Sequence, residues 1–117
     1  MKRKTLFTLF ALVGAASIIA QGISYTAVQA AKHVGETTTI TGTVDAVHQS
    51  GKGNIFLNMG GKYPNQAFTA FIPSASAAQF HNPRQYEGRT ASVSGKISLY
   101  KGKPEIIVNS PSQLSMK

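Results

Sequence analysis

The sequence of 117 residues contains no cysteine and no tryptophan, and only four of its residues are acidic. Without cysteine the chain can form neither a disulfide nor a thiolate metal site, so its fold depends on packing and backbone hydrogen bonds. The acidic residues are far apart in the sequence, at Glu36, Asp45, Glu87 and Glu105. No two of them form an obvious acid–base pair, which argues against general acid–base catalysis.

Histidine is also scarce, and His33, His48 and His81 lack the short spacing of metal-binding motifs. The serines follow strand-like or helix-capping patterns, and none lies in a motif that would activate it as a nucleophile. We therefore predict that the protein is not an enzyme and that it has no catalytic residues, no cofactor and no metal site.

The first thirty residues have the three parts of a secretory signal peptide. Three basic residues follow Met1, residues 5–20 are uncharged and mostly apolar, and Val28-Gln29-Ala30 places small residues at the −3 and −1 positions. A retained membrane anchor is the alternative, but residues 5–20 are shorter than the ~20 residues of a membrane-spanning helix. We predict cleavage after Ala30, no stable membrane span afterwards, and a periplasmic or secreted domain of residues 31–117.

Residues 31–117 carry nine lysines and arginines against the four acidic residues, a net charge of +5. A positive surface favours anionic partners, which include nucleic acid and an anionic envelope surface of lipopolysaccharide or phospholipid headgroups. A charge of this size is also common in proteins that need it only for solubility. Charge alone therefore does not select the partner.

Alternation of apolar and polar residues predicts five strands, at residues 37–47, 54–59, 66–72, 89–100 and 104–108. Eight apolar residues fall on the inward register and form the predicted core: Ile40, Val44, Leu57, Phe68, Ile72, Val93, Ile97 and Ile106. Ala46 and Leu99 fall on the same inward register, whereas Phe56 and Phe71 fall on the opposite face. A register error of one residue would exchange these two faces.

A short helix is predicted between the third and fourth strands, at residues 74–80, with Ser74 as its N-cap. The first and fourth strands are long, and Gly42 and Gly95 interrupt them where a strongly bent strand needs a small residue. Closing the five strands into a barrel would leave no long edge exposed. The order of elements predicts an all-β fold, a five-stranded Greek-key OB-fold barrel with a short helix between strands three and four. An open five-stranded sheet and an SH3-like barrel are the alternatives.

The OB-fold binds its ligands on the face of its second and third strands, between two flanking loops. Aromatic rings for base stacking and lysines for phosphates are what binding of single-stranded nucleic acid requires, and both residue types fall on or beside this face. The predicted nucleic-acid-binding residues are Lys52, Asn54, Phe56, Asn58, Lys62, Tyr63, Thr69, Lys101 and Lys103. Turn lysines are also common as plain solvated residues, and Tyr63 beside Pro64 can simply pack its own loop.

Five segments carry a resemblance to a known family: ITGTV at 40–44, NIFLN at 54–58, KYPNQAFT at 62–69, VSGKI at 93–97 and YKGKPEI at 100–106. They resemble the bacterial OB-fold nucleic-acid-binding-domain family, which includes small exported single-domain proteins. The similarity covers nearly all of residues 31–117 and implies an OB barrel that binds nucleic acid. A more distant resemblance is to the small periplasmic bacterial OB-fold stress proteins, which do not imply a nucleic-acid ligand.

Residues and resemblance together predict an exported OB-fold protein that binds single-stranded DNA or RNA with little sequence specificity. The alternative is a periplasmic envelope-stress or structural module that binds a small ligand or a protein partner through the same barrel face. A peripheral envelope protein held on anionic lipid is a third alternative.

Overall fold

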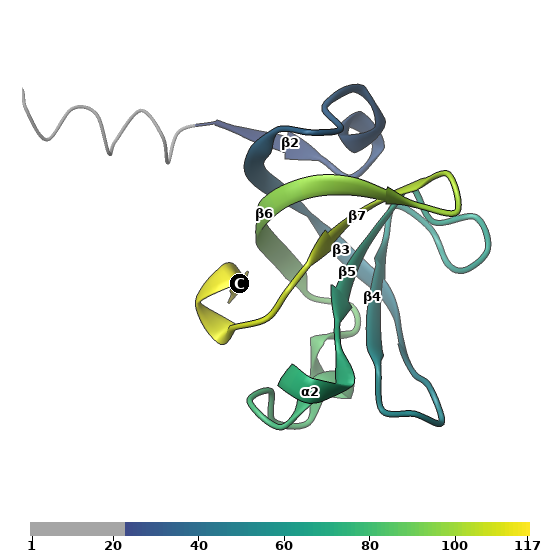
Figure 1. The fold of residues 1–117 in the computed structure, drawn as a ribbon, viewed down its shortest axis with the longest axis vertical. Helices are drawn as coiled ribbons and strands as arrows, with labels where there is room; N and C mark the ends of the chain where they lie inside the picture. The colour runs from purple at the N-terminus through teal and green to yellow at the C-terminus, as the bar shows by residue number, and fades with distance from the viewer. Residues whose placement is uncertain (1–22) are drawn as a thin grey trace, which may run out of the picture.

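The computed structural model describes residues 23–117 (Figure 1). These residues form seven β-strands, in which apolar residues alternate, and four short helical segments. The strands are β2 (Ser24–Thr26), β3 (Thr37–Gln49), β4 (Ile55–Met59), β5 (Phe68–Ile72), β6 (Thr90–Tyr100), β7 (Lys103–Ile107) and β8 (Leu114–Met116). The helical segments are the 3-10 helices η2 (Val28–Lys32), η3 (Pro83–Tyr86) and η4 (Pro111–Gln113), and the short α-helix α2 (Ser74–Ala77). The basic and apolar parts of the predicted signal peptide lie outside the described residues.

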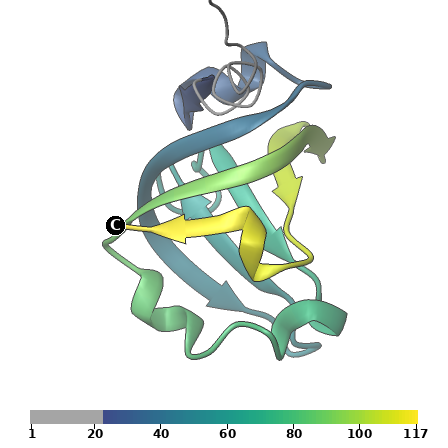
Figure 2. The same ribbon diagram turned by 90° about the vertical axis from the view of Figure 1, so that its left-hand side faces the viewer.

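Five of the strands pair in a closed ring, in the order β3, β4, β5, β7 and β6, with β6 returning to β3. The β5–β7 pair is parallel, and the other four pairs of the ring are antiparallel. The short strand β2 joins β3, and β8 joins β6 (Figure 2). The chain is thus all-β with an OB-like arrangement, and the predicted order of three strands, a helix and two strands is confirmed within the ring.

The two long strands bend because each contributes to two faces of the ring. β3 pairs with β6 over residues 37–43 and with β4 over residues 44–49, and its register shifts between Val44 and Ala46, as at a β-bulge. β6 passes from β3 to β7 beside Gly95, which has a φ of +152°. A Cβ at Gly95 would lie 2.7 Å from Ile106 Cγ2, so this bend requires glycine. At Gly42 a Cβ would make only an ordinary contact of 3.4 Å.

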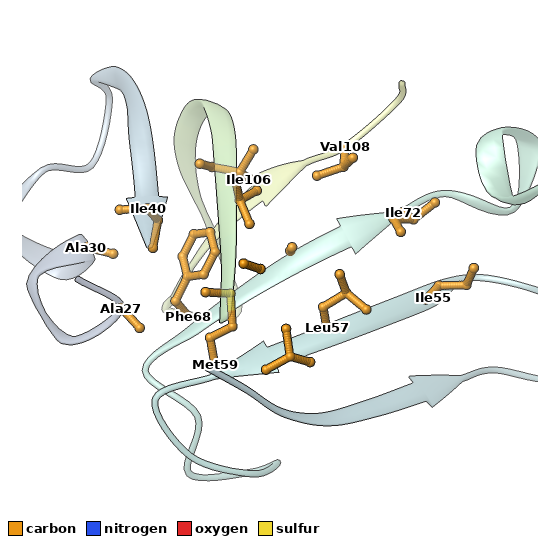
Figure 3. Packing of buried hydrophobic residues seen from close by; sticks show 14 of the residues in the cluster. Ala27, Ala30, Ile40, Ile55, Leu57, Met59, Phe68, Ile72, Ile106 and Val108 are labelled. Atoms are coloured by element: carbon orange, nitrogen blue, oxygen red, sulfur yellow. The ribbon is translucent and has the colours of Figure 1, made fainter. Parts of the chain in front are cut away.

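The interior of the ring is filled by the inward residues of its strands (Figure 3). All eight predicted core residues have an exposed fraction of zero: Ile40, Val44, Leu57, Phe68, Ile72, Val93, Ile97 and Ile106. Phe56 and Phe71 lie half-buried on the outer face and face each other across β4 and β5. The predicted register of the two strands that carry the candidate site is therefore confirmed.

Two residues that were predicted to point inward do not. Because the bulge in β3 shifts the alternation by one residue, Ala46 faces outward and Val47 takes the buried position opposite Leu57. Leu99 is 56% exposed and lies next to the β6–β7 turn.

The predicted helix at residues 74–80 is shorter and is capped differently. It spans only Ser74–Ala77, and Pro73 rather than Ser74 occupies the N-cap position. The backbone N–H of Ser74 donates to Asn54 Oδ1 at 2.8 Å. A side chain from the β3–β4 turn therefore satisfies a donor at the start of α2, as N-capping side chains do in other helices.

The fold begins upstream of Ala31, the predicted first residue of the domain. β2 pairs with β3 in parallel through three residue pairs, from Ser24 with Thr39 to Thr26 with Thr41. Ala27 and Ala30 are 5% and 0% exposed and belong to the core (Figure 3). The predicted cleavage site after Ala30 therefore lies inside η2, among packed residues.

Polar and aromatic contacts tie the same segment to the start of β3. The Tyr25 ring stacks on His33, with ring centroids 3.6 Å apart. The Tyr25 hydroxyl donates to Glu36 at 3.3 Å, and Glu36 also lies 2.7 Å from His33 Nδ1. Within residues 23–117, none of the helices has the length and hydropathy to cross a membrane.

Candidate nucleic-acid interface

A groove of about 760 Å³ crosses the outer face of the ring, and residues of all five ring strands and of their connecting turns line it. Its position follows from the register, because every second residue of these strands points away from the core. Seven of the nine predicted binding residues line this groove: Phe56, Asn58, Lys62, Tyr63, Thr69, Lys101 and Lys103. The structure thus brings together most of the predicted site.

An aromatic row runs across this face, which we define as His48, Phe56 and Phe71. Cross-strand pairing places His48 opposite Phe56, and Phe56 opposite Phe71. The ring centroids of His48 and Phe56 are 5.7 Å apart, and those of Phe56 and Phe71 are 5.2 Å apart. Three planar side chains therefore lie side by side on the outer surface, where flat ligands can stack on them.

A second row of cross-strand neighbours is polar. Asn58 pairs with Thr69, and the Thr69 hydroxyl donates to Asn58 Oδ1 at 2.9 Å. Gln66 Nε2 donates to Thr69 Oγ1 at 3.4 Å, while Gln66 Oε1 is buried and has no hydrogen-bond partner among the described residues. All three side chains are less than one-tenth exposed. Asn58 and Thr69 therefore form the floor of the groove.

On β7, Glu105 pairs with Thr69 and so extends this second row of polar residues. It lines the groove, and no basic side chain in residues 23–117 forms a salt bridge with it. Burial raises the pKa of the Glu105 carboxyl. The groove therefore contains one carboxylate without a cationic partner.

The lysines gather at one end of the groove. The β4–β5 loop with Lys62 and the β6–β7 turn with Lys101 lie side by side (Figure 1), because β5 and β7 run parallel. Lys101 has a φ of +50° in this two-residue turn, and its Nζ lies 5.3 Å from the centre of the Tyr100 ring. We call Lys62 and Lys101 the lysine rim.

Three predicted binding residues have other roles or positions. Lys103 Nζ donates to the carbonyl oxygens of Pro64 and Gln66, at 2.8 and 3.2 Å, so its ammonium group holds the β4–β5 loop. Asn54 caps α2 through its side-chain oxygen. Lys52 lies in the β3–β4 turn at the opposite end of β4 and does not line the groove. Sequence alone does not reveal such long-range partners.

Eight further residues line the groove that were not predicted as binding residues: Ala46, His48, Ser50, Pro64, Gln66, Tyr100, Pro104 and Glu105. Alternation could have revealed two of them, because Tyr100 and Glu105 occupy outward positions of their strands. His48 escaped prediction because the first strand was predicted to end at residue 47, whereas β3 extends to Gln49. In the described part of the chain, no three His, Asp or Glu side chains gather closely enough to hold a metal ion.

No protein-family model and no curated protein matches the chain. Among solved structures it is similar to the aspartyl tRNA synthetase of Entamoeba histolytica, at 18% identity and a TM-score of 0.55, over 85% of this chain and 22% of the synthetase. It is also similar to a Leishmania major protein assigned as an aspartyl-tRNA synthetase, at 10% identity and a TM-score of 0.53, over 80% and 20% of the two chains.

The chain thus spans about a fifth of the length of these two proteins. At such low identity the likeness shows the fold alone, and it agrees with the OB-like ring of strands. These two structures therefore support the OB-like fold that the family resemblance implied, but not the family itself.

Proposed function

We propose that this protein is a non-enzymatic, exported protein that binds single-stranded nucleic acid with little sequence specificity. Its ring of strands is, in this proposal, a five-stranded Greek-key OB barrel. The observation that carries the proposal is the groove on the outer face, which His48 and Phe56 of the aromatic row line together with the lysine rim. Both structurally similar proteins are named as aspartyl-tRNA synthetases, whose name refers to a nucleic acid, and this supports a nucleic-acid ligand.

The groove would bind a strand by two separate interactions. Bases stack on the aromatic row, and each stacked base contributes ~1–3 kcal/mol. The lysine rim neutralises phosphates and releases counterions, which makes the affinity depend on salt. Phosphate contacts do not distinguish one base from another, and stacking distinguishes bases only weakly. We therefore expect little overall sequence specificity.

A salt titration tests this function. The full folded protein is titrated with labelled oligothymidylate of about 15 nucleotides, within the site sizes of OB domains, at about 50 and 200 mM salt. Two phosphate contacts from Lys62 and Lys101 predict a log–log salt slope of roughly −1.4 for a single strand. Absence of measurable binding at the lower salt concentration would refute the nucleic-acid function.

A protein-binding module is the second candidate, and exposed apolar residues favour it. Leu99, Tyr100 and Ile107 are 56%, 55% and 44% exposed on β6 and β7, and Tyr100 lines the groove. Large apolar side chains on the surface contribute to protein–protein contacts in many domains. If the salt titration shows no binding of nucleic acid, this surface becomes the first one to test against protein partners.

Export is the part of the proposal that rests on the amino terminus. Three basic residues and the uncharged run at 5–20 support it. Cleavage after Ala30 would remove β2 together with the buried Ala27 and Ala30. Cleavage after Gly22 would leave all of these residues in the mature protein, and it also has small residues, Ala20 and Gly22, at the −3 and −1 positions. We therefore propose processing after Gly22.

The intact mass of the protein recovered from the periplasm or medium of an expressing bacterium tests both statements. A mass equal to that of residues 23–117 supports export with processing after Gly22. A mass equal to that of residues 31–117 would instead support the cleavage site expected from the sequence. Recovery of the unprocessed chain from the cytoplasm would contradict export.

A further inference from the structure

The polar row beside the aromatic row has unused hydrogen-bonding groups, and the inference drawn from them rests on the proposed nucleic-acid function. Cross-strand pairing makes Ala46, Asn58, Thr69, Glu105 and Ser98 consecutive neighbours across the five strands of the ring. The two outer members are small, so the three central side chains determine the chemistry of the row. We call Asn58, Thr69 and Glu105 the polar row.

The donors and acceptors of the polar row are arranged unequally. Asn58 Oδ1 accepts from Thr69, and in the described residues the side-chain amide of Asn58 makes no hydrogen bond as a donor. On the other side, the Glu105 carboxylate has neither a salt bridge nor a hydrogen bond within residues 23–117. The β4 side of the row thus offers an N–H donor and the β7 side offers two carboxylate acceptors.

Gln66 adds a second unpartnered acceptor to the lining of the groove. Its Oε1 atom is buried at the groove and has no hydrogen-bond partner among the described residues. Buried side-chain polar atoms in folded proteins nearly always have a partner, from the protein, from water or from a ligand. Gln66 and Glu105 both line the groove, so its lining contains two side chains with acceptors that have no donor partner in the described residues.

The spacing fits the edge of a nucleobase. β4 and β7 are two strand positions apart, which separates the backbones of Asn58 and Glu105 by roughly 10 Å. Phe56 precedes Asn58 by two residues on the same face of β4, about 7 Å along the strand. A base stacked on Phe56 would therefore lie within reach of the polar row.

We propose that the polar row binds the Watson–Crick edge of one guanine in the bound strand. The Glu105 carboxylate accepts from N1–H and from the exocyclic N2 amine, and the Asn58 amide donates to O6. Among the common bases only guanine places two donors side by side, which matches the two oxygens of a carboxylate. Thymine and uracil would place carbonyl oxygens against Glu105, and adenine and cytosine each have a single exocyclic donor group.

Oligothymidylates of one length that differ only in the central base test the proposal. The central base is guanine, inosine, adenine, cytosine or thymine, and binding is measured at one salt concentration. A bidentate contact to guanine should strengthen binding roughly tenfold over thymine. Inosine lacks the exocyclic amine and should lose most of this gain.

Glu105→Gln is the matching variant, because it keeps the size of the side chain but replaces one acceptor by a donor. It should abolish the guanine preference while binding of all-thymine strands persists. Glu36→Gln is the control, since it removes the same charge beside His33 and away from the groove. This control should retain the guanine preference. Thermal unfolding of each variant establishes that it is folded.

Each outcome distinguishes this proposal from the function on which it rests. Equal affinity of the wild-type protein for all five strands would overturn guanine binding and leave the nucleic-acid function standing. A guanine preference that survives Glu105→Gln would overturn the assignment to the polar row. Lack of binding to every strand at about 50 mM salt would overturn both proposals.

Discussion

Phe56 is the residue on which base stacking depends most, because it lies at the centre of the aromatic row between His48 and Phe71. Replacing Phe56 with Ala should weaken binding of single strands by ~1–3 kcal/mol. The salt slope should stay unchanged, since no phosphate contact is lost. Leu99→Ala removes an exposed apolar side chain that does not line the groove, and it should leave the affinity unchanged. Parallel titrations of the two variants compare these outcomes.

Lys101 and Lys103 are neighbours in sequence but should respond differently to substitution. Lys101→Gln removes a cation of the lysine rim and should flatten the salt slope by ~0.7 without changing stability. Lys103→Gln removes the donor to Pro64 and Gln66 and should lower stability by about 1 kcal/mol. Salt titrations and urea unfolding of both variants provide the two readouts. A stability loss in Lys101→Gln but not in Lys103→Gln would contradict these roles.

Glu105 should make the protein less stable at neutral pH than at mildly acidic pH. Burial raises the pKa of its carboxyl, so the folded state binds the proton more tightly than the unfolded chain does. The contribution of Glu105 to stability therefore falls as the pH rises from the ordinary glutamate value through the raised folded value.

Glu105→Gln removes this ionisation and should raise the melting temperature at neutral pH. The difference from wild type should vanish below about pH 4, where the carboxyl is protonated in both states. Melting curves of the two proteins between about pH 4 and 8 measure it. A variant that is less stable than wild type at neutral pH would show that the ionised carboxylate has a stabilising partner.

At the scale of the elements, the bend in β6 depends on one glycine. Gly95→Ala would force a Cβ to within 2.7 Å of Ile106 Cγ2 at a φ of +152°, and we expect a loss of ~2 kcal/mol or more. Gly42→Ala is the matched control in β3, where the added Cβ would meet Met59 Cε at 3.4 Å. Its cost should be less than ~1 kcal/mol. Urea unfolding of both variants compares them, and equal losses would contradict this difference.

The bulge in β3 links the bend of that strand to the site. The register shift lies next to Asp45, whose carboxylate accepts from the N–H of Gly61 at 2.7 Å. This contact ties β3 to the β4–β5 loop that carries Lys62. Because the bulge also turns His48 outward, one local irregularity both positions a ring of the aromatic row and anchors the lysine rim.

At the scale of the whole molecule, the segment before Ala31 completes the core. A protein of residues 31–117 would lose the pairing of β2 with β3 and the buried Ala27 and Ala30. Losing two buried methyl groups and three strand pairs should lower the free energy of unfolding by at least ~2 kcal/mol relative to a protein of residues 23–117. Chemical denaturation of the two proteins tests it. Equal stabilities would show that the segment contributes only a surface contact.

The sequence by itself determined which face of β4 and β5 is buried. Leu57 and Phe68 point inward and Phe56 and Phe71 outward because side chains of a strand alternate with a period of two, and this rule needs only neighbouring residues. The same rule, with the turn and helix signals, was enough to predict five strands in their correct order. Seven of the nine binding residues predicted from the sequence line the groove.

Only the tertiary structure decided what several of these residues contact. Lys103 holds a loop that lies 37 and 39 residues away in sequence, and Asn54 caps a helix 20 residues away. The sequence predicts Ala30 as the end of a signal peptide, and only the structure shows that Ala30 is buried, because β2 and η2 pack onto the ring. Partners so far apart along the chain leave no local pattern, since they meet only when the five strands close and bring their ends together.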